Sequence, residues 1–532
     1  MTDTVLLGDE AVALGAIHAG LTAAYAYPGT PSTEILEYLL KHSEKHGGPH
    51  AAWCANEKTA YEEALGVSFA GRRALVAMKH VGLNVAADPF INSALVDING
   101  GLVVVVADDP GMHSSQNEQD SRYYADFARI ICLEPATQQQ AYEMTREAFD
   151  LSERFHIPVM IRLVTRLAHS RSAVRTGEAR KENSLGEPPD PSGWILLPSN
   201  ARRRWHSLLE RQRDFSIYSE TSPNNTLTLN DQQRELGVIT TGIAENYFLE
   251  NVDELPFEPS HLHIGAYPLP VEKIRRLVEH ADKLLVLEEG YPFLERFLRG
   301  IVPPPIEIQG KQSGHVPAQG ELTPDNVRKA LGLDERKGVE LAGLTLPARP
   351  PQLCAGCPHS DTYHALKQAV APFEPALVTS DIGCYTLGAL APYSAIQSCV
   401  CMGASIGMAK GASEAGFRPV IAVIGDSTFL HSGVTALMDA VAANTDMTLV
   451  IMDNETVAMT GGQPSIMSSS RLERLIAGLG VDPEHFHLLS AHPKFTDHNA
   501  EVIRNEITYR GLSVIVAVRE CIETARKHKA KR

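Results

Sequence analysis

Residues 417–454 constrain the fold of this chain more than any other stretch. Two short apolar runs, VIAVIG and MTLVIMD, flank a segment in which Leu430, Val434, Leu437 and Val441 recur at helical spacing. The pattern predicts a strand, a helix and a second strand. In a right-handed crossover the two strands are parallel, and their carboxyl ends meet at one edge of the sheet. We therefore expect a parallel-sheet α/β domain with a ligand site at that edge.

Polar residues follow both predicted strands: Gly425-Asp426-Ser427 comes after the first, and Asp453-Asn454 after the second. A small hard cation takes about six oxygen ligands, several from phosphate and water, and Asp426 and Asn454 can supply two. Gly425 lets the backbone approach a diphosphate, and the amides after Ser427 point toward the anion. The combination indicates the magnesium-diphosphate half of a thiamine diphosphate site, although an isolated GD pair is more often a surface turn.

The length and the charge of the chain narrow the remaining possibilities. Its 532 residues are enough for roughly three domains. A net charge of −16 repels phosphate backbones, which excludes nucleic acid as an expected partner. The sequence has no basic leader and no run of about 18 apolar residues, so we expect a cytoplasmic protein without a membrane segment. Eight cysteines in such a chain favour thiol chemistry or metal ligation over disulfides.

Apolar runs divide the chain into four parts. Residues 1–170 contain ALVAMKH, GLVVVVADD and PVMIRLV between amphipathic stretches, which predicts a parallel sheet. Residues 171–232 are polar, with EPPDPSG and SETSPNNT as breakers and only WHSLLERQ as a hint of a helix, and indicate a linker or insertion. Residues 233–345 form a smaller α/β unit built on ELGVITTG, HLHIGAY and ADKLLVLEEG, with a helix in LPVEKIRRLVEHA. Residues 346–532 follow the proline-rich LTLPARPP and end with the strand GLSVIVAV.

Thiamine diphosphate also needs a carboxylate at its other end. Its thiazolium C2 loses a proton, attacks a carbonyl carbon and holds the resulting carbanion as an enamine. A carboxylate beside N1′ of the aminopyrimidine favours the imino tautomer that removes this proton. Glu57 is the candidate, because a helix that starts there buries Ala60, Ala64 and Val67 and ends near Gly71. The alternative is a surface glutamate at a helix start, where the helix dipole favours it.

The whole chain resembles the alpha subunits of the indolepyruvate ferredoxin oxidoreductase family, within the 2-oxoacid ferredoxin oxidoreductases. The matching segments are AYPGTPSTEI, WCANEKTA, MKHVGLNVAADP, VVVVADDPGMHSSQNEQDSR, CAGCPH, DIGCYTLGAL, CMGASIGMAKG, GDSTFLHSG and DNETVAMTGGQ. The resemblance implies that residues 1–170 bind the aminopyrimidine, that residues 346–532 bind the diphosphate, and that residues 233–345 resemble a transketolase carboxyl-terminal domain. It implies the following cofactor-binding residues: Glu57 at N1′; Asp426, Asn454 and the Thr456 carbonyl on magnesium; and Gly425, Ser427, Asp381 and Gly383 nearby.

The same resemblance suggests residues for the substrate. Thr30, in PGTPS, matches a residue that contacts the substrate in related pyruvate enzymes, and Arg122 matches their carboxylate-binding arginine. A guanidinium fork suits a carboxylate, whereas the alternative for Arg122 is a surface ion pair. His80, His113 and His359 lie beside glycine or proline, where a histidine can donate to an oxyanion or shuttle a proton. We place His80 in the catalytic group, with a structural histidine as the alternative for each.

The cysteines provide a possible route for electrons. The resemblance implies that Cys354, Cys357, Cys384 and Cys521 hold one [4Fe–4S] cluster, because related enzymes have cysteines at these places. From the sequence spacing alone, a zinc site or unliganded core cysteines are the stronger alternatives. The other cysteines are expected to be small buried residues: Cys54, Cys132, Cys399 and Cys401.

We expect an oxidative decarboxylase of aryl 2-oxo acids such as indolepyruvate, which forms the arylacetyl-coenzyme A together with a coenzyme A-binding beta subunit. Alpha subunits of this type commonly continue into a ferredoxin-like segment, whereas this sequence stops eleven residues after Cys521. Electrons would then pass to a partner subunit or a separate ferredoxin, or an aldehyde is released. The rival functions are a non-oxidative decarboxylase or carboligase and a non-catalytic scaffold. An oligomer is expected, with the site formed within or between chains.

Overall fold

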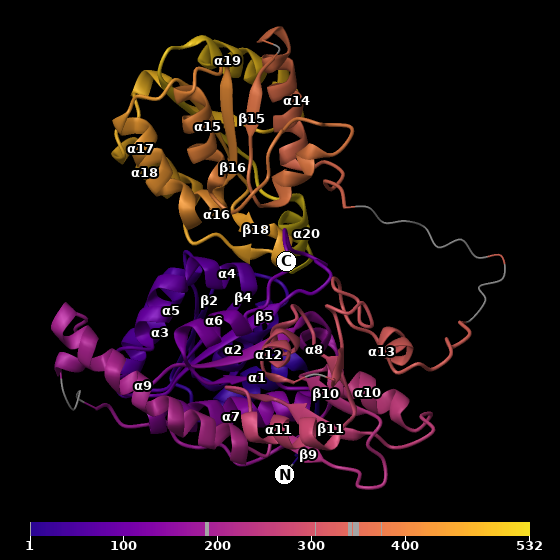
Figure 1. Ribbon diagram of the computed structural model, residues 1–532. Coiled ribbons are helices and arrows are strands. Elements are labelled where there is room, and N and C mark those ends of the chain that lie inside the picture. Colours follow the sequence, from indigo (N-terminus) through magenta and orange to yellow (C-terminus); the bar gives the residue numbers. More distant parts are fainter. Residues whose placement is uncertain are drawn as a thin grey trace. The chain divides into compact units, whose positions relative to one another are not determined.

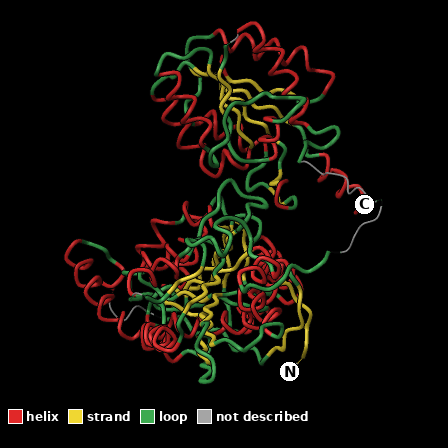
Figure 2. Tube along the Cα trace, turned by 45° about the vertical axis from the view of Figure 1, so that its right-hand side comes forward, coloured by secondary structure: helices red, strands yellow, loops and turns green. Residues whose placement is uncertain are grey.

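A computed structural model describes residues 2–186, 191–303, 305–338, 343, 351–373 and 375–531. The chain forms two compact units, residues 1–340 and residues 341–532 (Figure 1). Each unit is built on central strands with helices on the outside, as the colouring by secondary structure shows (Figure 2). No helix in the described ranges has both the length and the apolar character needed to cross a membrane.

The larger sheet of the first unit has seven strands. In spatial order they are β12 (Ala266–Tyr267), β6 (Cys132–Leu133), β7 (Val159–Val164), β5 (Leu102–Asp108), β4 (Ala74–Lys79), β2 (Ala23–Ala26) and β3 (His50–Trp53). Six of them are parallel, and the edge strand β12 is antiparallel to its neighbour β6. The apolar runs at β4, β5 and β7 are buried along their whole length, as expected for strands covered on both faces. These three strand predictions are confirmed.

Helices connect and cover the strands of this sheet (Figure 1). They are α1 (Gly8–His18), α2 (Thr33–His46), α3 (Glu57–Phe69), α4 (His80–Val85), α5 (Ala87–Ser93), α6 (Arg122–Ala128), α7 (Gln138–Phe155) and α8 (Thr165–His169). The first strand, β1 (Thr2–Leu7), pairs antiparallel with β8 (Arg171–Thr176) in a separate two-stranded sheet. The parallel crossovers bring the residues that follow β2, β3, β4 and β5 to one edge of the seven-stranded sheet.

A second sheet of five strands completes the first unit. Its order is β14 (Glu307–Gln309), β13 (Lys283–Leu287), β10 (Gly237–Thr241), β11 (Ser260–Ile264) and β9 (Asn225–Thr228), and its helices are α10 (Ala244–Val252), α11 (Val271–His280), α12 (Phe293–Ile301) and α13 (Pro324–Ala330). The predicted strands and the helix α11 are confirmed. HLHIGAY, however, divides into β11 and β12, and β12 joins the larger sheet. One hydrophobic core runs through both sheets.

Residues 171–232 were expected to be a linker or insertion, and the structure contradicts an unstructured linker for most of that segment. The segment contains β8, a 3-10 turn (Pro191–Trp194), the 24-residue helix α9 (Pro198–Thr221) and the edge strand β9. The helix suggested by WHSLLERQ is part of α9. Only Leu208, Phe215 and Ser219 of α9 are buried, so the apolar stripe of this helix is too narrow to give a clear periodic signal. Four residues of EPPDPSG, 187–190, and most of LTLPARPP lie outside the described residues, and so does the predicted boundary at 345/346.

The second unit has a five-stranded, wholly parallel sheet. Its order is β15 (Leu377–Thr379), β16 (Val420–Gly425), β17 (Met447–Asp453), β21 (Leu512–Val518) and β20 (Phe486–Ser490). Its helices are α14 (Pro358–Val370), α15 (Ala404–Glu414), α16 (Asp426–Thr428), α17 (Val434–Ala442), α18 (Ser469–Gly478), α19 (Thr496–Thr508) and α20 (Ile522–Lys531), and β18 (Thr456–Val457) pairs with β19 (Gln463–Pro464). The predicted strand, helix and strand around GDS and DN are confirmed, and so is the strand at GLSVIVAV.

Candidate active site

Glu57 lies at the carboxyl edge of the seven-stranded sheet, where it begins helix α3 after strand β3. The side chain of Asn56 caps this helix by accepting from the Thr59 amide at 2.9 Å. Glu57 is only 5% exposed, which contradicts the alternative of a surface glutamate. A Cβ atom added to Gly82, in α4, would lie 2.6 Å from Glu57 Oε1. The carboxylate is therefore packed against the α4 backbone, and Gly82 is a supporting residue that the sequence did not reveal.

Lys79 ends strand β4 at the same edge, and the sequence prediction missed it. Its Nζ donates to the carbonyl of Ser114 at 2.7 Å and to the Ser114 hydroxyl at 3.1 Å. That hydroxyl donates to the carbonyl of Thr30 at 3.2 Å, so the structure brings Thr30 and Lys79 together. Burial lowers the pKa of Lys79 to about 8, and the nearby Asp109 opposes this shift. The sequence did contain a signal for this residue, because Lys79 is the one charged residue in the otherwise apolar strand β4.

The three histidines have different surroundings. His80 begins α4, is buried, and places Nε2 3.3 Å from the Asn117 carbonyl; its Nδ1 has no hydrogen-bond partner among the described residues. His113 is about half exposed and pairs with Glu321 at 3.5 Å. His359, in the second unit, is buried, and burial lowers its pKa to about 4. His80 therefore lies buried at the edge that carries Glu57 and Lys79, whereas His113, in the segment after β5, is the more exposed of the two.

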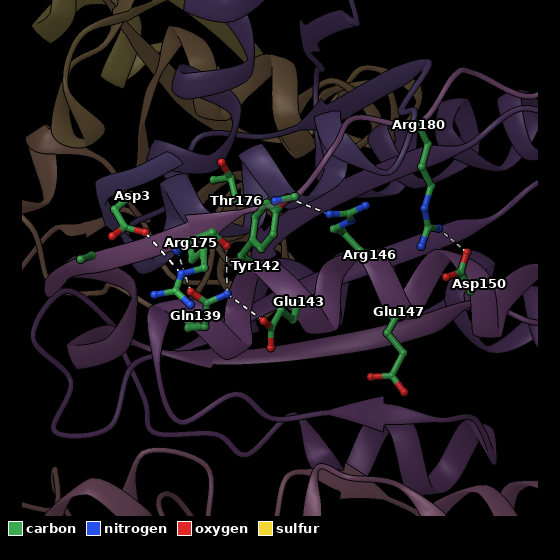
Figure 3. Close-up of a pocket in the computed structure, with 12 residues that line it drawn as sticks. Asp3, Gln139, Tyr142, Glu143, Arg146, Glu147, Asp150, Arg175, Thr176 and Arg180 are labelled. Atoms are coloured by element: carbon green, nitrogen blue, oxygen red, sulfur yellow. Dashed lines mark hydrogen bonds and ion pairs between the residues drawn. The ribbon is translucent and has the colours of Figure 1, made fainter. Parts of the chain in front are cut away.

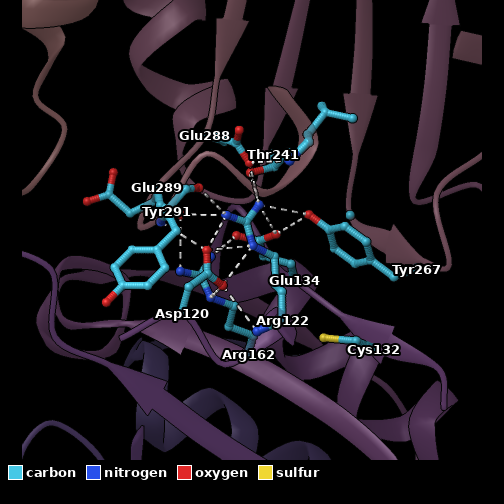
Figure 4. A network of polar contacts seen from close by, with 12 residues as sticks. Asp120, Arg122, Cys132, Glu134, Arg162, Thr241, Tyr267, Glu288, Glu289 and Tyr291 are labelled. Carbon is cyan, nitrogen blue, oxygen red and sulfur yellow. Dashed lines mark hydrogen bonds and ion pairs between the residues drawn. The ribbon is translucent and has the colours of Figure 1, made fainter. Parts of the chain in front are cut away.

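Arg122 does not have the surroundings predicted for a substrate ligand. Its guanidinium is 1% exposed and donates to Asp120 at 2.9 Å, to the carbonyl of Glu289 at 2.9 Å and to the hydroxyl of Tyr267 at 3.3 Å. It also pairs with Glu288 at 3.1 Å. Figure 4 shows these groups on all sides of the guanidinium. These contacts give the assignment of Arg122 to the substrate carboxylate no support, and the alternative of a surface ion pair is wrong, because Arg122 is buried.

The sequence could not show that Arg122 is enclosed by acids, because most of its partners lie far from it along the chain. Arg122 belongs to a buried network between the two sheets of the first unit (Figure 4). Its ionisable members are Asp108, Asp120, Glu134, Glu288, Glu289, Arg122 and Arg162. Glu289 joins the network through its backbone carbonyl, and burial raises the pKa of its carboxyl group to about 7.

The first unit also has a surface groove of about 730 Å³ between α7, β1 and β8 (Figure 3). It contains two ion pairs: Arg175 with Asp3 at 3.6 Å, and Arg180 with Asp150 at 2.5 Å. The groove includes none of the residues at the carboxyl edge. It is therefore separate from the candidate active site.

In the second unit, the residues predicted to hold magnesium follow neighbouring parallel strands. Gly425 ends β16 beside Met452 of β17, and Asp453 ends β17. Asp426 is 4% exposed. Asp426 Oδ2 and Ser427 Oγ are buried and have no hydrogen-bond partner in the described part of the chain. Burial and the neighbouring Asp453 raise the pKa of Asp426 to about 7. Unsatisfied buried oxygens beside a second acid fit a bound cation.

A tight turn after β17 positions the other expected ligands. Glu455 has φ 58°, in the left-handed region that side chains seldom adopt, and such strain is common at ligand sites. The Thr456 amide donates to Asn454 Oδ1 at 3.2 Å, and the Asn454 amide lies 3.1 Å from His359 Nε2. Because burial keeps His359 neutral, its ring can accept from that amide. This hydrogen bond orients the Asn454 side chain so that its oxygen points away from His359. The assignment of Asn454 as a magnesium ligand requires this orientation.

Tyr385 is a further residue that the sequence did not reveal. A Cβ atom on Gly425 would lie 2.6 Å from the Tyr385 ring, and one on Gly383 would lie 2.2 Å from it. The Tyr385 ring therefore leaves no space for a side chain at residue 425. This packing is sufficient to explain why residue 425 is glycine, whereas the sequence led us to explain it by close approach of a diphosphate. The Tyr385 hydroxyl donates to the buried Asp381, whose second oxygen accepts from the Ser405 amide at 3.2 Å.

The four cysteines predicted as cluster ligands lie near one another in the second unit. Burial and the charges of the other three thiols raise the pKa of Cys384 to about 12. Cys357 donates its amide to the Cys354 carbonyl at 3.0 Å just before α14, and the Cys521 amide donates to the Asn454 carbonyl at 3.2 Å. The thiols therefore gather beside the magnesium motif.

The burial of the remaining cysteines tests the rest of the cysteine prediction. Cys54 and Cys132 are buried as predicted, but Cys399 and Cys401 are exposed, so that part of the prediction is wrong.

Comparison with known proteins agrees with the candidate residues of each unit. Residues 14–196 match the family described as pyruvate flavodoxin/ferredoxin oxidoreductase, thiamine diP-bdg, and residues 381–489 match thiamine pyrophosphate enzyme, C-terminal TPP binding domain. The fold and the site thus define a thiamine diphosphate-dependent 2-oxoacid oxidoreductase.

Two curated relatives identify the family. The indolepyruvate oxidoreductase subunit IorA of Archaeoglobus fulgidus is 37% identical over 97% of this chain and 86% of its own length, and that of Thermococcus kodakarensis is 34% identical over 97% and 85%. The chain therefore belongs to the IorA family of indolepyruvate oxidoreductase subunits.

A solved structure shares the fold. It is the 2-oxoglutarate:ferredoxin oxidoreductase of Magnetococcus marinus, with a TM-score of 0.51, 19% identity, and coverage of 62% of this chain and 65% of that chain.

Proposed function

We propose that the chain catalyses the oxidative decarboxylation of aryl 2-oxo acids of the indolepyruvate type to arylacetyl-coenzyme A. The names of the relatives support the substrate class and a multisubunit enzyme. A beta subunit would bind coenzyme A, and a ferredoxin or another partner would accept the electrons. The observation that carries the proposal is the group of four cysteines beside the magnesium motif, because a non-oxidative decarboxylase has no use for a redox centre.

We assign Glu57 to N1′ of the aminopyrimidine. Bound thiamine diphosphate supplies an electron sink for the carbanion formed when carbon dioxide leaves. The buried position of Glu57 and its contact with α4 support a carboxylate held in one orientation. In the second unit, Asp426, Asn454 and the Thr456 carbonyl would hold magnesium, which would carry the diphosphate. The unsatisfied oxygens of Asp426 and Ser427 support this assignment.

We assign the substrate carboxylate to Lys79 and Thr30 in place of Arg122. All the observed contacts of Arg122 are inside the buried network, whereas Lys79 ends a strand at the edge that carries Glu57. Three donors are available on an ammonium, and the Ser114 carbonyl and hydroxyl account for two of them. His80 lies next in the chain, with one ring nitrogen unsatisfied, and is placed to exchange a proton with the substrate.

We assign the first electron-accepting centre to Cys354, Cys357, Cys384 and Cys521 as a [4Fe–4S] cluster. Four thiols that influence one another electrostatically provide the number and type of ligands that such a cluster takes. The hydrogen bond from Cys521 to Asn454 connects these cysteines directly with the cofactor motif. An electron would therefore have a short path from the cofactor to the cluster.

The test uses protein purified under anaerobic conditions. We expect about four iron and four sulfide per chain, and reduction of a dye when indolepyruvate and the beta subunit are added. Aliphatic oxo acids should react more slowly. Cys384→Ser should lose the iron and the dye reduction, whereas Cys399→Ser, at an exposed cysteine, should keep both. Iron-free protein that releases an aldehyde would instead establish the non-oxidative decarboxylase.

A further inference from the structure

Three potential metal ligands meet at helix ends in the first unit, away from the residues discussed so far. Asp9 is the second residue of α1, Glu34 is the second residue of α2, and His169 is the last residue of α8. One ligand atom from each lies within 4.8 Å of the other two. His169 Nε2 is 3.4 Å from Glu34 Oε2. This combination of one imidazole and two carboxylates is a donor set that divalent metal ions accept.

Asp9 provides an independent reason to expect a ligand. Its side chain is fully buried, and neither of its carboxylate oxygens has a hydrogen-bond partner in the described part of the chain. Glu34 Oε2 is also buried without a hydrogen bond. Among the described residues, Asp9 forms no ion pair, and Glu34 forms an ion pair only with His169. A buried carboxylate without a counter-charge is costly, so something must neutralise this pair.

The backbone holds the three ligands in place. Gly8, directly before Asp9, lies so close to α8 that an added Cβ atom would be 2.2 Å from the Leu167 carbonyl oxygen. Helix α1 also packs against α2. The ends of the three helices are therefore fixed relative to one another before any ion binds. His169 and Glu34 are each about one-third exposed, which gives an ion access from solvent.

We propose that Asp9, Glu34 and His169 form a binding site for one first-row divalent cation, with Zn²⁺ as the probe. Bonds of about 2.0–2.2 Å would place the ligand atoms about 3.0–3.5 Å apart, a small contraction from their present positions. Water would complete the coordination on the exposed side. The ion would neutralise Asp9 and connect α1, α2 and α8, so its role is structural and does not depend on the proposed function.

The competing explanation is a proton shared between Asp9 and Glu34. Without an ion, burial and the neighbouring Glu34 raise the pKa of Asp9 well above its usual range, so the shared proton is a real alternative. The variant Asp9→Asn separates the two. An amide replaces a protonated carboxyl with little loss, because it also donates a hydrogen bond, whereas it is a poor ligand for zinc.

The experiment measures zinc bound to the full chain by equilibrium dialysis and metal analysis. Wild type should bind one equivalent more than Asp9→Asn, and zinc should raise the thermal midpoint of wild type by more than that of the variant. Any zinc taken up by the cysteines of the second unit contributes equally to both proteins, so the difference isolates this site. His169→Gln, at a partly exposed position, should give the same result and covers the case in which Asp9→Asn does not fold.

A matched control uses another histidine that is paired with a glutamate. His206→Gln, in the exposed pair with Glu210, should leave the zinc stoichiometry unchanged. Equal zinc binding and equal thermal shifts in wild type, Asp9→Asn and His169→Gln would overturn the proposal. The shared proton would then be the remaining explanation.

Discussion

At the scale of single residues, the surroundings of a side chain decide its role more than its type does. Glu57 and Arg122 were both chosen from the sequence as functional groups. Glu57 lies buried at the sheet edge, whereas Arg122 is enclosed by acids. Glu57 could be predicted because a helix start is a local signal. The partners of Arg122 include Tyr267 and Glu289, which lie more than 140 residues further along the chain, and no local sequence pattern indicates them.

Replacing Glu57 with glutamine tests the assignment at N1′. Glu57→Gln keeps the shape of the side chain but cannot stabilise the imino tautomer, so exchange of the C2 proton should slow by about 10²–10⁴-fold. Thiamine diphosphate should still bind, because the contacts proposed for its diphosphate lie in the second unit. Proton exchange followed by NMR measures the effect. Glu62→Gln, at an exposed position of the same helix, is the control, and wild-type exchange in Glu57→Gln would remove Glu57 from this role.

Lys79 leads to a prediction about substrate affinity. A hydrogen bond to a charged group contributes about 1.5–3 kcal/mol, so Lys79→Met should raise KM for the oxo acid by about 10–100-fold. Lys58→Met, at an exposed lysine of α3, should leave KM unchanged. Steady-state kinetics measures both variants, and thermal melting shows whether Lys79→Met is folded. An unchanged KM in folded Lys79→Met would exclude Lys79 as the carboxylate ligand.

The same lysine predicts a pH dependence. Burial lowers the pKa of Lys79 to about 8, so the ammonium is present below that pH and is lost above it. In wild type, kcat/KM should therefore fall by about tenfold for each pH unit above 8. Lys79→Arg, whose guanidinium stays protonated, should remove this decline. A decline that persists unchanged in Lys79→Arg would show that another group titrates.

At the scale of elements, the sequence predicts strands and helices that have a regular apolar pattern. It misses elements whose packing depends on residues far away in the chain. The wholly apolar runs of β5 and β16 could be recognised as buried strands. Of helix α9, only the part at WHSLLERQ gave a hint, because the helix contributes only a few side chains to the core and carries apolar residues such as Trp205 and Ile217 on exposed faces. The cysteine group was found only through the resemblance, since Cys354 and Cys521 are brought together by the sheet and not by spacing.

Gly425 gives a prediction at this scale. Gly425→Ala would place a methyl group 2.6 Å from the Tyr385 ring at the end of β16. The clash should reduce the stability of the second unit by about 1–3 kcal/mol and loosen the cofactor motif. Denaturant unfolding measures the change. Gly407→Ala, in helix α15 with no atom within 4 Å of the new methyl, should be neutral or slightly stabilising. Equal stability of both variants would contradict this role of Tyr385.

At the scale of the whole molecule, the buried ionic network unites the two sheets of the first unit. Arg122 extends from α6 of the first sheet to Glu288, which follows β13 of the second. Arg162, in β7, reaches the carbonyl of Glu289 at 3.1 Å. Charges buried in this way hold the two sheets in one alignment, because any shift would leave a charge without its partner.

Removing the guanidinium tests this role of Arg122. Arg122→Met leaves Asp120 and Glu288 buried without their counter-charge, so the first unit should lose about 3–5 kcal/mol of stability. Arg275→Met, in an exposed pair with Glu272, should lose less than about 1 kcal/mol. Thermal and denaturant unfolding compare the two. A stable Arg122→Met with a raised KM would restore the substrate role.

The two-residue strand β12 has a consequence for how this protein can be divided. Ala266 and Tyr267 pair with Leu133 and Cys132, so a later part of the chain covers the outer edge of the seven-stranded sheet. A fragment that stopped near residue 170 would leave this edge open to strand addition by other molecules, and would expose acids that are now enclosed. Such a fragment should aggregate. Gene fusions, truncations and recombination between relatives should therefore succeed only when residues 1–340 are transferred as one piece.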